Sequence, residues 1–241
     1  MTSKLNGAEA MVQMLQAHGV RHMFGLAGDT TLPFYDAMLR LDHGITHVMT
    51  RDERSATYMA DGYSRATGRL GVVCATSGPG ATNMITGVAN AFADGAPLLV
   101  ITGQPAIQNF GLGAFQEGSC TGINTVSMFE SCTRFNTLVS HSAQLEPKLV
   151  QAISFAKSRH PGPVHLSIPL DIMREKVRRV DVRAGMRAFI NHDTMPSVGG
   201  QDLVHKNLAN AKRVTLVIGP GCQEAIHDMI ALAEQRQWLM V

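Results

Sequence analysis

The sequence of 241 residues contains no apolar run near the length of about 20 residues that a membrane-spanning helix needs. Its most apolar stretch, residues 96–101, has only the length of a β-strand. The first residues, Met-Thr-Ser-Lys-Leu-Asn, lack the apolar core of a signal peptide. The sequence also has little excess charge of either sign, because 21 lysines and arginines are balanced by 19 aspartates and glutamates, which leaves a net charge of +2. We therefore expect neither a membrane nor a nucleic acid as a partner.

Cysteine is scarce as well, with four residues at positions 74, 120, 132 and 222. This wide spacing is not that of a disulfide framework and fits no zinc motif, so we expect no metal site in this chain. Scattered thiols without a pairing pattern are typical of a reducing compartment, and we expect a cytoplasmic protein.

Apolar residues are abundant, at 45% of the chain against 17% charged residues, which is enough to bury a substantial core. At about 150 residues per domain, the length corresponds to about one and a half domains. Strand-like and helix-like patterns alternate along the first part of the chain. We expect strands at 20–24, 46–50, 70–76, 98–102, 134–138 and 164–168, and helices at 7–18, 32–39, 53–67, 81–93 and 146–158.

Six strands linked by helical crossovers predict an α/β fold with a doubly wound, mostly parallel six-stranded sheet covered by helices on both faces. We place this domain at residues 1–172. Ligands of such sheets bind beyond the carboxyl ends of the strands, so we expect the site in the loops that follow the first, third and fourth strands.

The regular alternation ends after residue 172. We interpret residues 173–210, which include a basic stretch at 174–183, as a linker. A strand at 213–218, a helix to residue 235 and a second strand at 238–241 then predict the start of a truncated second α/β domain at residues 211–241. So few elements cannot bury their apolar faces alone.

Two local signals lie at predicted strand ends. The segment from Ser77 to Asn83 is a glycine-rich turn that opens a helix, and its free backbone N–H groups suit a phosphate or a polar heterocycle. It fits neither the GxGxxG nor the P-loop pattern, so a ligand site and a tight structural turn stay equally open from the residues alone. The segment from Arg51 to Arg54 places two acids at the start of a helix, and the residues alone favour helix capping there.

A series of motifs runs through the first 172 residues in a fixed order. They are Phe24-Gly25, Arg51-Asp52-Glu53, Ala60-Asp61-Gly62-Tyr63, Thr76-Ser77-Gly78-Pro79-Gly80-Ala81-Thr82-Asn83, Ile101-Thr102-Gly103-Gln104, Ala114-Phe115-Gln116-Glu117 and Arg159-His160-Pro161-Gly162-Pro163-Val164. In order and spacing this series resembles the thiamine-diphosphate-dependent enzymes of the acetolactate synthase type. The resemblance implies that residues 1–172 are the pyrimidine-binding domain and that residues 211–241 begin the central domain.

The resemblance also implies roles for individual residues. Glu53 matches the catalytic glutamate that hydrogen-bonds the aminopyrimidine ring and activates the cofactor. Further residues match positions that hold the cofactor, namely Gly28, Pro79, Asn83 and Gln116. On the substrate side, Gln116 matches a polar group that reaches the reacting centre and Phe115 is its apolar neighbour. Among the departures from the family, Asp52 stands where the synthases usually have histidine.

The family's diphosphate and Mg²⁺ are held by a third domain, through a Gly-Asp-Gly motif that this sequence lacks. The resemblance therefore implies an N-terminal part of an enzyme that decarboxylates and ligates a 2-oxo acid, inactive as an isolated chain. It implies thiamine diphosphate as cofactor, FAD as a candidate in the complete enzyme, a homodimer or homotetramer, and branched-chain amino acid biosynthesis as a candidate pathway. The alternative is a non-catalytic binding or assembly module.

Overall fold

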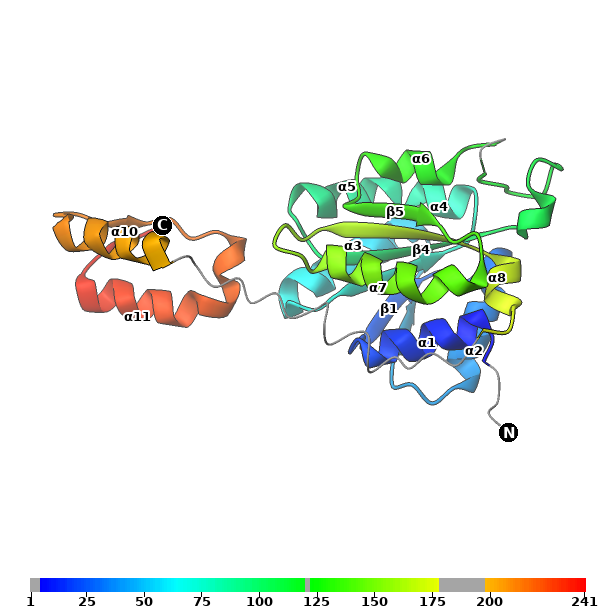
Figure 1. The fold of residues 1–241 in the computed structure, drawn as a ribbon, viewed down its shortest axis with the longest axis horizontal. Coiled ribbons are helices and arrows are strands. Elements are labelled where there is room, and N and C mark those ends of the chain that lie inside the picture. The colour runs from blue at the N-terminus through cyan, green and yellow to red at the C-terminus, as the bar shows by residue number, and fades with distance from the viewer. Residues whose placement is uncertain (1–4, 120–121, 178–197) are drawn as a thin grey trace. The chain divides into compact units, whose positions relative to one another are not determined.

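The computed structural model describes residues 5–119, 122–177 and 198–241. The chain divides into two compact units, Met1–His192 and Asp193–Val241 (Figure 1). The first unit contains one six-stranded sheet with helices packed on it.

The sheet is parallel throughout, with the strand order β2-β1-β3-β4-β6-β5. Its strands are β1 (His22–Gly25), β2 (Thr46–Met49), β3 (Gly71–Ala75), β4 (Leu98–Gln104), β5 (Phe135–Leu138) and β6 (Pro163–Pro169). Every residue of β3, β4 and β6 is buried, as expected for central strands that are covered on both faces. The predicted α/β fold with a six-stranded sheet is therefore confirmed.

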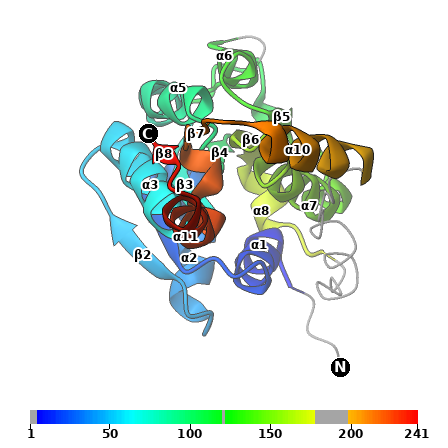
Figure 2. The ribbon, with the colours of Figure 1, turned by 90° about the vertical axis from the view of Figure 1, so that its left-hand side faces the viewer.

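Helices cover both faces of this sheet (Figure 2). They are α1 (Gly7–Ala17), α2 (Leu32–Arg40), α3 (Glu53–Thr67), α4 (Pro79–Asn83), α5 (Ile85–Ala93), α6 (Thr125–Glu130), α7 (Leu145–Ala156) and α8 (Leu170–Arg174). One apolar cluster joins α1, α2, α7 and α8 to the sheet, and a second joins α3, α4, α5 and α6 to it. The alternating side chains of each central strand supply both clusters, because successive strand residues point to opposite faces.

Local signals account for the ends of α3. Asp52 is the N-cap residue and its carboxylate accepts the N–H of Ser55 at 2.8 Å. Gly68 ends the helix in the left-handed conformation at φ 67°, which glycine adopts without a steric cost. The predicted bounds 53–67 agree with the observed helix because the residues at both caps, Asp52 and Gly68, are types that favour helix ends.

Two predicted elements differ from the structure. The helix expected over 81–93 begins earlier, at Pro79, and is divided at Met84, whose N–H bonds the carbonyl of Ala81 three residues back and tightens the last turn of α4. The predicted fourth strand is longer, because β4 continues to Gln104 and carries that side chain into the buried end of the sheet.

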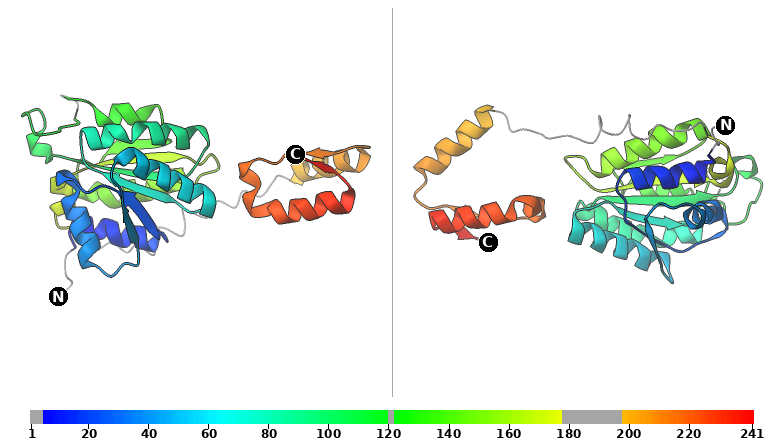
Figure 3. Two further views of the ribbon diagram at one scale, coloured as in Figure 1. Left: turned by 180° about the vertical axis from the view of Figure 1, so that it is seen from behind. Right: turned by 90° about the horizontal axis from the view of Figure 1, so that it is seen from below.

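The second unit contains α10 (Val198–Asn210), the parallel strand pair β7 (Thr215–Leu216) and β8 (Leu239–Met240), and α11 (Ile226–Arg236) (Figure 3). Helix α10 falls inside the range predicted as a linker, whose residues 178–197 lie outside the described part of the chain. Among the described side chains of this unit, only Ala233 is buried. The domain boundaries and the second α/β domain stay predictions.

His165 is a buried titratable group in the middle of the first unit. It lies on β6 at 0% exposure and stacks on Phe129 with ring centroids 4.1 Å apart. Its Nδ1 lies 2.7 Å from Oδ1 of Asn136 and its Nε2 lies 2.8 Å from Oγ1 of Thr102. No cation is formed at neutral pH, because burial lowers the pKa of His165 to about 3.

We expect this histidine to make the fold sensitive to acid. Since the unfolded histidine binds a proton below about pH 6.5 and the buried one does not, the free energy of unfolding falls by about 1.4 kcal/mol per pH unit below that value. This loss continues toward the folded pKa of about 3. Urea unfolding between pH 7.5 and 5 should show a shallower pH dependence for His165→Gln than for the wild type. The same substitution at exposed His160 is the control, and equal slopes for the wild type and His165→Gln would contradict the prediction.

No helix in the described ranges is both long and apolar enough to cross a membrane.

Candidate functional site

The loops after β1, β3 and β4 meet at one threonine. Oγ1 of Thr30, just after β1, lies 2.9 Å from Oγ1 of Thr76 and accepts the N–H of Ser77 at 3.1 Å. Gly103 on β4 packs so closely on Thr30 that an added Cβ would lie 2.2 Å from Oγ1. The chain leaves β1 toward one face of the sheet and β3 toward the other, which makes this junction a topological switch point, the usual ligand site of such sheets.

Glu53 is the buried acid of this site, with 8% of its surface exposed. It begins α3, where the helix dipole stabilises a negative charge. Its Oε2 accepts a hydrogen bond from Nδ2 of Asn83, which ends α4, at 3.0 Å. Among the described residues Asn83 is the only hydrogen-bond partner of this carboxylate, so Oε1 is left to bond a ligand.

Asp52, where the synthases usually have histidine, turns its carboxylate to the start of the helix. Its two oxygens accept the N–H and the hydroxyl of Ser55 at 2.8 and 2.6 Å. These hydrogen bonds to Ser55 lower the pKa of Asp52 and keep it ionised. Adjacent acids thus have different tasks, because Asp52 caps the helix while Glu53 lies in the buried site.

The glycine-rich turn after β3 brings another predicted residue to the same place. Gly78 has φ 59° and ψ −121°, and a Cβ added there would lie 2.8 Å from Cβ of Gln116. Gln116 itself has φ 56°, a left-handed conformation uncommon for a residue with a side chain. Pro79 follows as the exposed first residue of α4.

Two further glycines pack around Thr76 between these loops. A Cβ added to Gly28 would lie 2.4 Å from Cβ of Thr76, and one added to Gly80 would lie 2.7 Å from its Cγ2. The Cβ added to Gly80 would also lie 3.4 Å from Oε1 of Glu53. Small residues here let the three loops approach one another beside the carboxylate.

The structure therefore brings Gly28, Glu53, Pro79, Asn83 and Gln116 together at the carboxyl ends of β1, β2, β3 and β4. Phe115, which directly precedes Gln116, is the exception, because it is 82% exposed.

Residues that were not predicted also contribute to the site. The hydroxyl of Tyr35 donates to the carbonyl of Cys74 at 3.2 Å, and burial, followed by Cys74 and least of all by Glu53, raises the pKa of Tyr35 so that it stays neutral. Gln104 and Glu117 each bind the backbone of the loop that presents Gln116. Gln104 and Glu117 stand inside the recognised motifs, but nothing in their spacing indicates these hydrogen bonds.

Two histidine pairs, His18 with His22 and His43 with His47, are spaced as HxxxH. Neither pair lies within a single helix, and no group of three or more potential metal-binding side chains occurs among the described residues.

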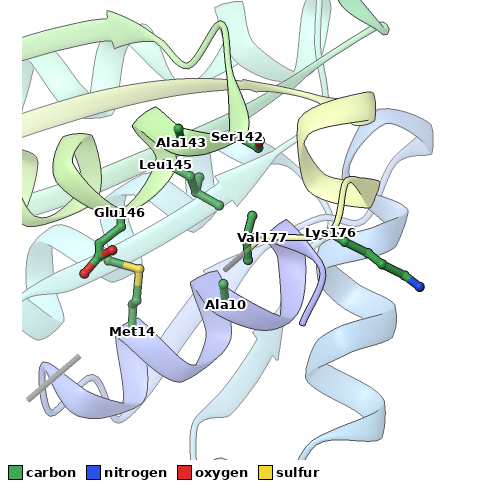
Figure 4. Close-up of a pocket in the computed structure, with 8 residues that line it drawn as sticks. All are labelled: Ala10, Met14, Ser142, Ala143, Leu145, Glu146, Lys176 and Val177. Atoms are coloured by element: carbon green, nitrogen blue, oxygen red, sulfur yellow. The ribbon is translucent and has the colours of Figure 1, made fainter. Parts of the chain in front are cut away.

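A cavity of about 330 Å³ lies elsewhere, between α1, the beginning of α7 and the end of the described first unit (Figure 4). Its lining includes Met14, Leu145, Glu146, Lys176 and Val177. None of the predicted site residues contributes to its walls.

Comparison with known proteins identifies the family of this chain. Residues 5–124 match the family model described as "Thiamine pyrophosphate enzyme, N-terminal TPP binding domain", thiamine pyrophosphate being another name for thiamine diphosphate. The chain thus contains the N-terminal cofactor-binding domain of the thiamine pyrophosphate enzymes.

Within this class the chain is homologous to the large subunits of acetolactate synthases. It is 40% identical over 240 residues to the probable acetolactate synthase large subunit of Methanocaldococcus jannaschii, an alignment that covers 95% of this chain and 39% of that protein. It is 38% identical to acetolactate synthase isozyme 2 large subunit of Escherichia coli over 217 residues, which are 90% of this chain and 38% of that protein. The isozyme 3 large subunit of Escherichia coli is 38% identical over 234 residues, 94% of this chain and 40% of that protein. The chain spans about two fifths of the length of these relatives.

Proposed function

We propose that this chain supplies the pyrimidine-binding half of the active site of an enzyme that decarboxylates a 2-oxo acid and ligates the product to a second carbonyl compound, as in acetolactate formation. When bound, thiamine diphosphate supplies the electron sink for this chemistry. The observation that carries the proposal is the Glu53 carboxylate, buried at the switch point with one oxygen bonded to Asn83 and the other free for a ligand.

The donor set fits an aminopyrimidine ring. Oε1 of Glu53 would hold a proton against a ring nitrogen, while Asn83 fixes the orientation of the carboxyl group through Oε2. Pro79 and Gly28 would contact the ring from the two loops on either side. Gln116 would reach the reacting centre, with Phe115 beside it on the substrate side.

The open side of the site supports the proposal that a second domain completes it. Asn83 is exposed although it bonds the buried acid, and Pro79, at the start of the same helix, is exposed as well. We propose that a domain outside this chain holds Mg²⁺ and the diphosphate, and that the enzyme is a homodimer or homotetramer in which the two halves meet. FAD stays a candidate second cofactor. The relatives are named as large subunits, which also favours an assembly of several chains.

Completion of the site can be tested by joining this chain to the remaining part of the Escherichia coli isozyme 2 large subunit, in place of the aligned 38% of that protein. We call this protein the joined enzyme. With pyruvate as the probe 2-oxo acid, we expect release of CO₂ that depends on both thiamine diphosphate and Mg²⁺. A joined enzyme that folds and binds the cofactor without this activity would contradict the proposal.

The chain alone provides the complementary measurement. Because it has no site for the diphosphate in this proposal, calorimetric titration of thiamine diphosphate and Mg²⁺ should show no tight binding. Tight, Mg²⁺-dependent binding by the chain alone would contradict the proposal that it supplies only half of the site. If neither the joined enzyme nor the chain alone is active, the non-catalytic module becomes the better explanation.

A further inference from the structure

The loop of residues 105–118 connects β4 to the start of the segment that leads into α6, and its two ends are fixed by buried or partly buried hydrogen bonds. The side chain of Gln104, 1% exposed, donates from Nε2 to the carbonyl of Gly118 at 3.1 Å and accepts the N–H of Gly118 at 3.0 Å. The carboxylate of Asp171 accepts the N–H of Ile107 at 3.3 and 3.2 Å from its two oxygens. The loop therefore has a firmly placed base.

A third contact crosses the middle of the loop. Both oxygens of the Glu117 carboxylate accept the N–H of Gly111, at 2.9 and 3.1 Å. One of them also accepts the hydroxyl of Ser119. Hydrogen bonds to an ionised carboxylate are stronger than those between neutral groups. Glu117 thus connects the first arm of the loop, which contains Gly111, to the second arm, which contains Gln116.

The residue held between these contacts is Gln116. Its φ of 56° is strained in a residue with a side chain, and such a conformation persists only where the surroundings impose it. Gln116 is followed directly by the anchored Glu117 and packs on Gly78, whose missing Cβ leaves the room. Gly111 and Gly113 have φ of 76° and 75°, so the first arm also follows a path that favours glycine.

We infer that Glu117 is a positioning residue for Gln116. By holding the Gly111 N–H and the Ser119 hydroxyl, its carboxylate keeps Gln116 in the left-handed conformation against Gly78. The side chain of Gln116 is thereby presented at the site that contains Glu53. The consequence for catalysis rests on the proposed function, whereas the effect on the loop does not.

Hydrogen–deuterium exchange of the chain itself tests the effect on the loop. We expect residues 105–118 to exchange at least about tenfold faster in Glu117→Ala, because the Gly111 N–H loses a charged acceptor. Glu117→Gln should restore most of the protection, since its carbonyl oxygen still accepts. Glu130→Ala removes an exposed acid at the end of α6 and should leave the loop unchanged. Unchanged exchange in Glu117→Ala would overturn the inference, as would equal acceleration in β4, which indicates general destabilisation.

A double-mutant cycle in the joined enzyme tests the consequence for catalysis. If Glu117 acts through Gln116, Glu117→Ala should lower kcat/KM at least about tenfold alone and less than about twofold in the Gln116→Ala background. Independent effects that multiply would overturn the positioning role. A joined enzyme without activity would contradict the proposed function only, because the exchange measurement still decides whether Glu117 holds the loop.

Discussion

Replacing Glu53 by glutamine in the joined enzyme is expected to lower kcat by about 10²–10⁴-fold, the range that general acid–base catalysis contributes. A carboxyl group can take up and return a proton at Oε1, whereas an amide of the same shape cannot. The substitution preserves the volume of the buried side chain, which is 8% exposed, and leaves an oxygen able to accept from Asn83. The fold should therefore survive while the proton transfer is lost.

Asn83→Ala provides the matched control for this experiment. It removes the 3.0 Å hydrogen bond to Oε2 but leaves the carboxyl group in place, so we expect a smaller loss than for Glu53→Gln. Thermal unfolding of both variants separates loss of catalysis from loss of fold. Activity of Glu53→Gln equal to that of the unmodified joined enzyme would exclude Glu53 as the residue that exchanges this proton.

Local signals in the sequence predicted the elements around Glu53 well. Asp52 and Gly68 mark the two ends of α3, and the fully apolar pattern of β3 predicted a strand buried on both faces. The division of α4 from α5 at Met84 was not predictable in this way, since it depends on one 3₁₀-type hydrogen bond in an otherwise helical pattern. Helix α10 was not predicted, because the charged, glycine-containing region before it indicated a linker. Its apolar residues are exposed in the structure.

The sequence indicated a set of candidate site residues but not their arrangement. The ordered motifs indicated Glu53, Asn83 and Gln116, whereas their proximity depends on the strand order of the sheet, which alternating patterns do not determine. The hydrogen bond from the Gly111 N–H to the Glu117 carboxylate depends on a loop path with three left-handed residues, and no local sequence rule predicts that path. Asp52 illustrates the same limit, because the sequence does not show that its side chain turns to Ser55 and caps the helix while that of Glu53 lies in the site.

Replacing Gly78 by alanine is expected to damage both the fold and the site. At φ 59° and ψ −121° a residue with a side chain is strained, and the added Cβ would lie 2.8 Å from Cβ of Gln116 and 3.2 Å from its Cα and carbonyl oxygen. We expect the free energy of unfolding of the chain to fall by about 2–4 kcal/mol, as strain and overpacking combine. Since a displacement of about 1 Å at a reacting group can cost about 10²-fold, kcat/KM of the joined enzyme should fall by a similar factor.

Gly62→Ala is the matched control, because it makes the same chemical change in a different environment. Gly62 is an exposed residue inside α3, and a Cβ added there meets no atom within 4 Å. Alanine should therefore stabilise the chain by about 0.5–1 kcal/mol, through its better helix propensity. Urea unfolding of the two variants should show opposite signs. If Gly78→Ala were as stable as the wild type, the turn would tolerate a side chain, and its contact with Gln116 would not be what holds that residue in place.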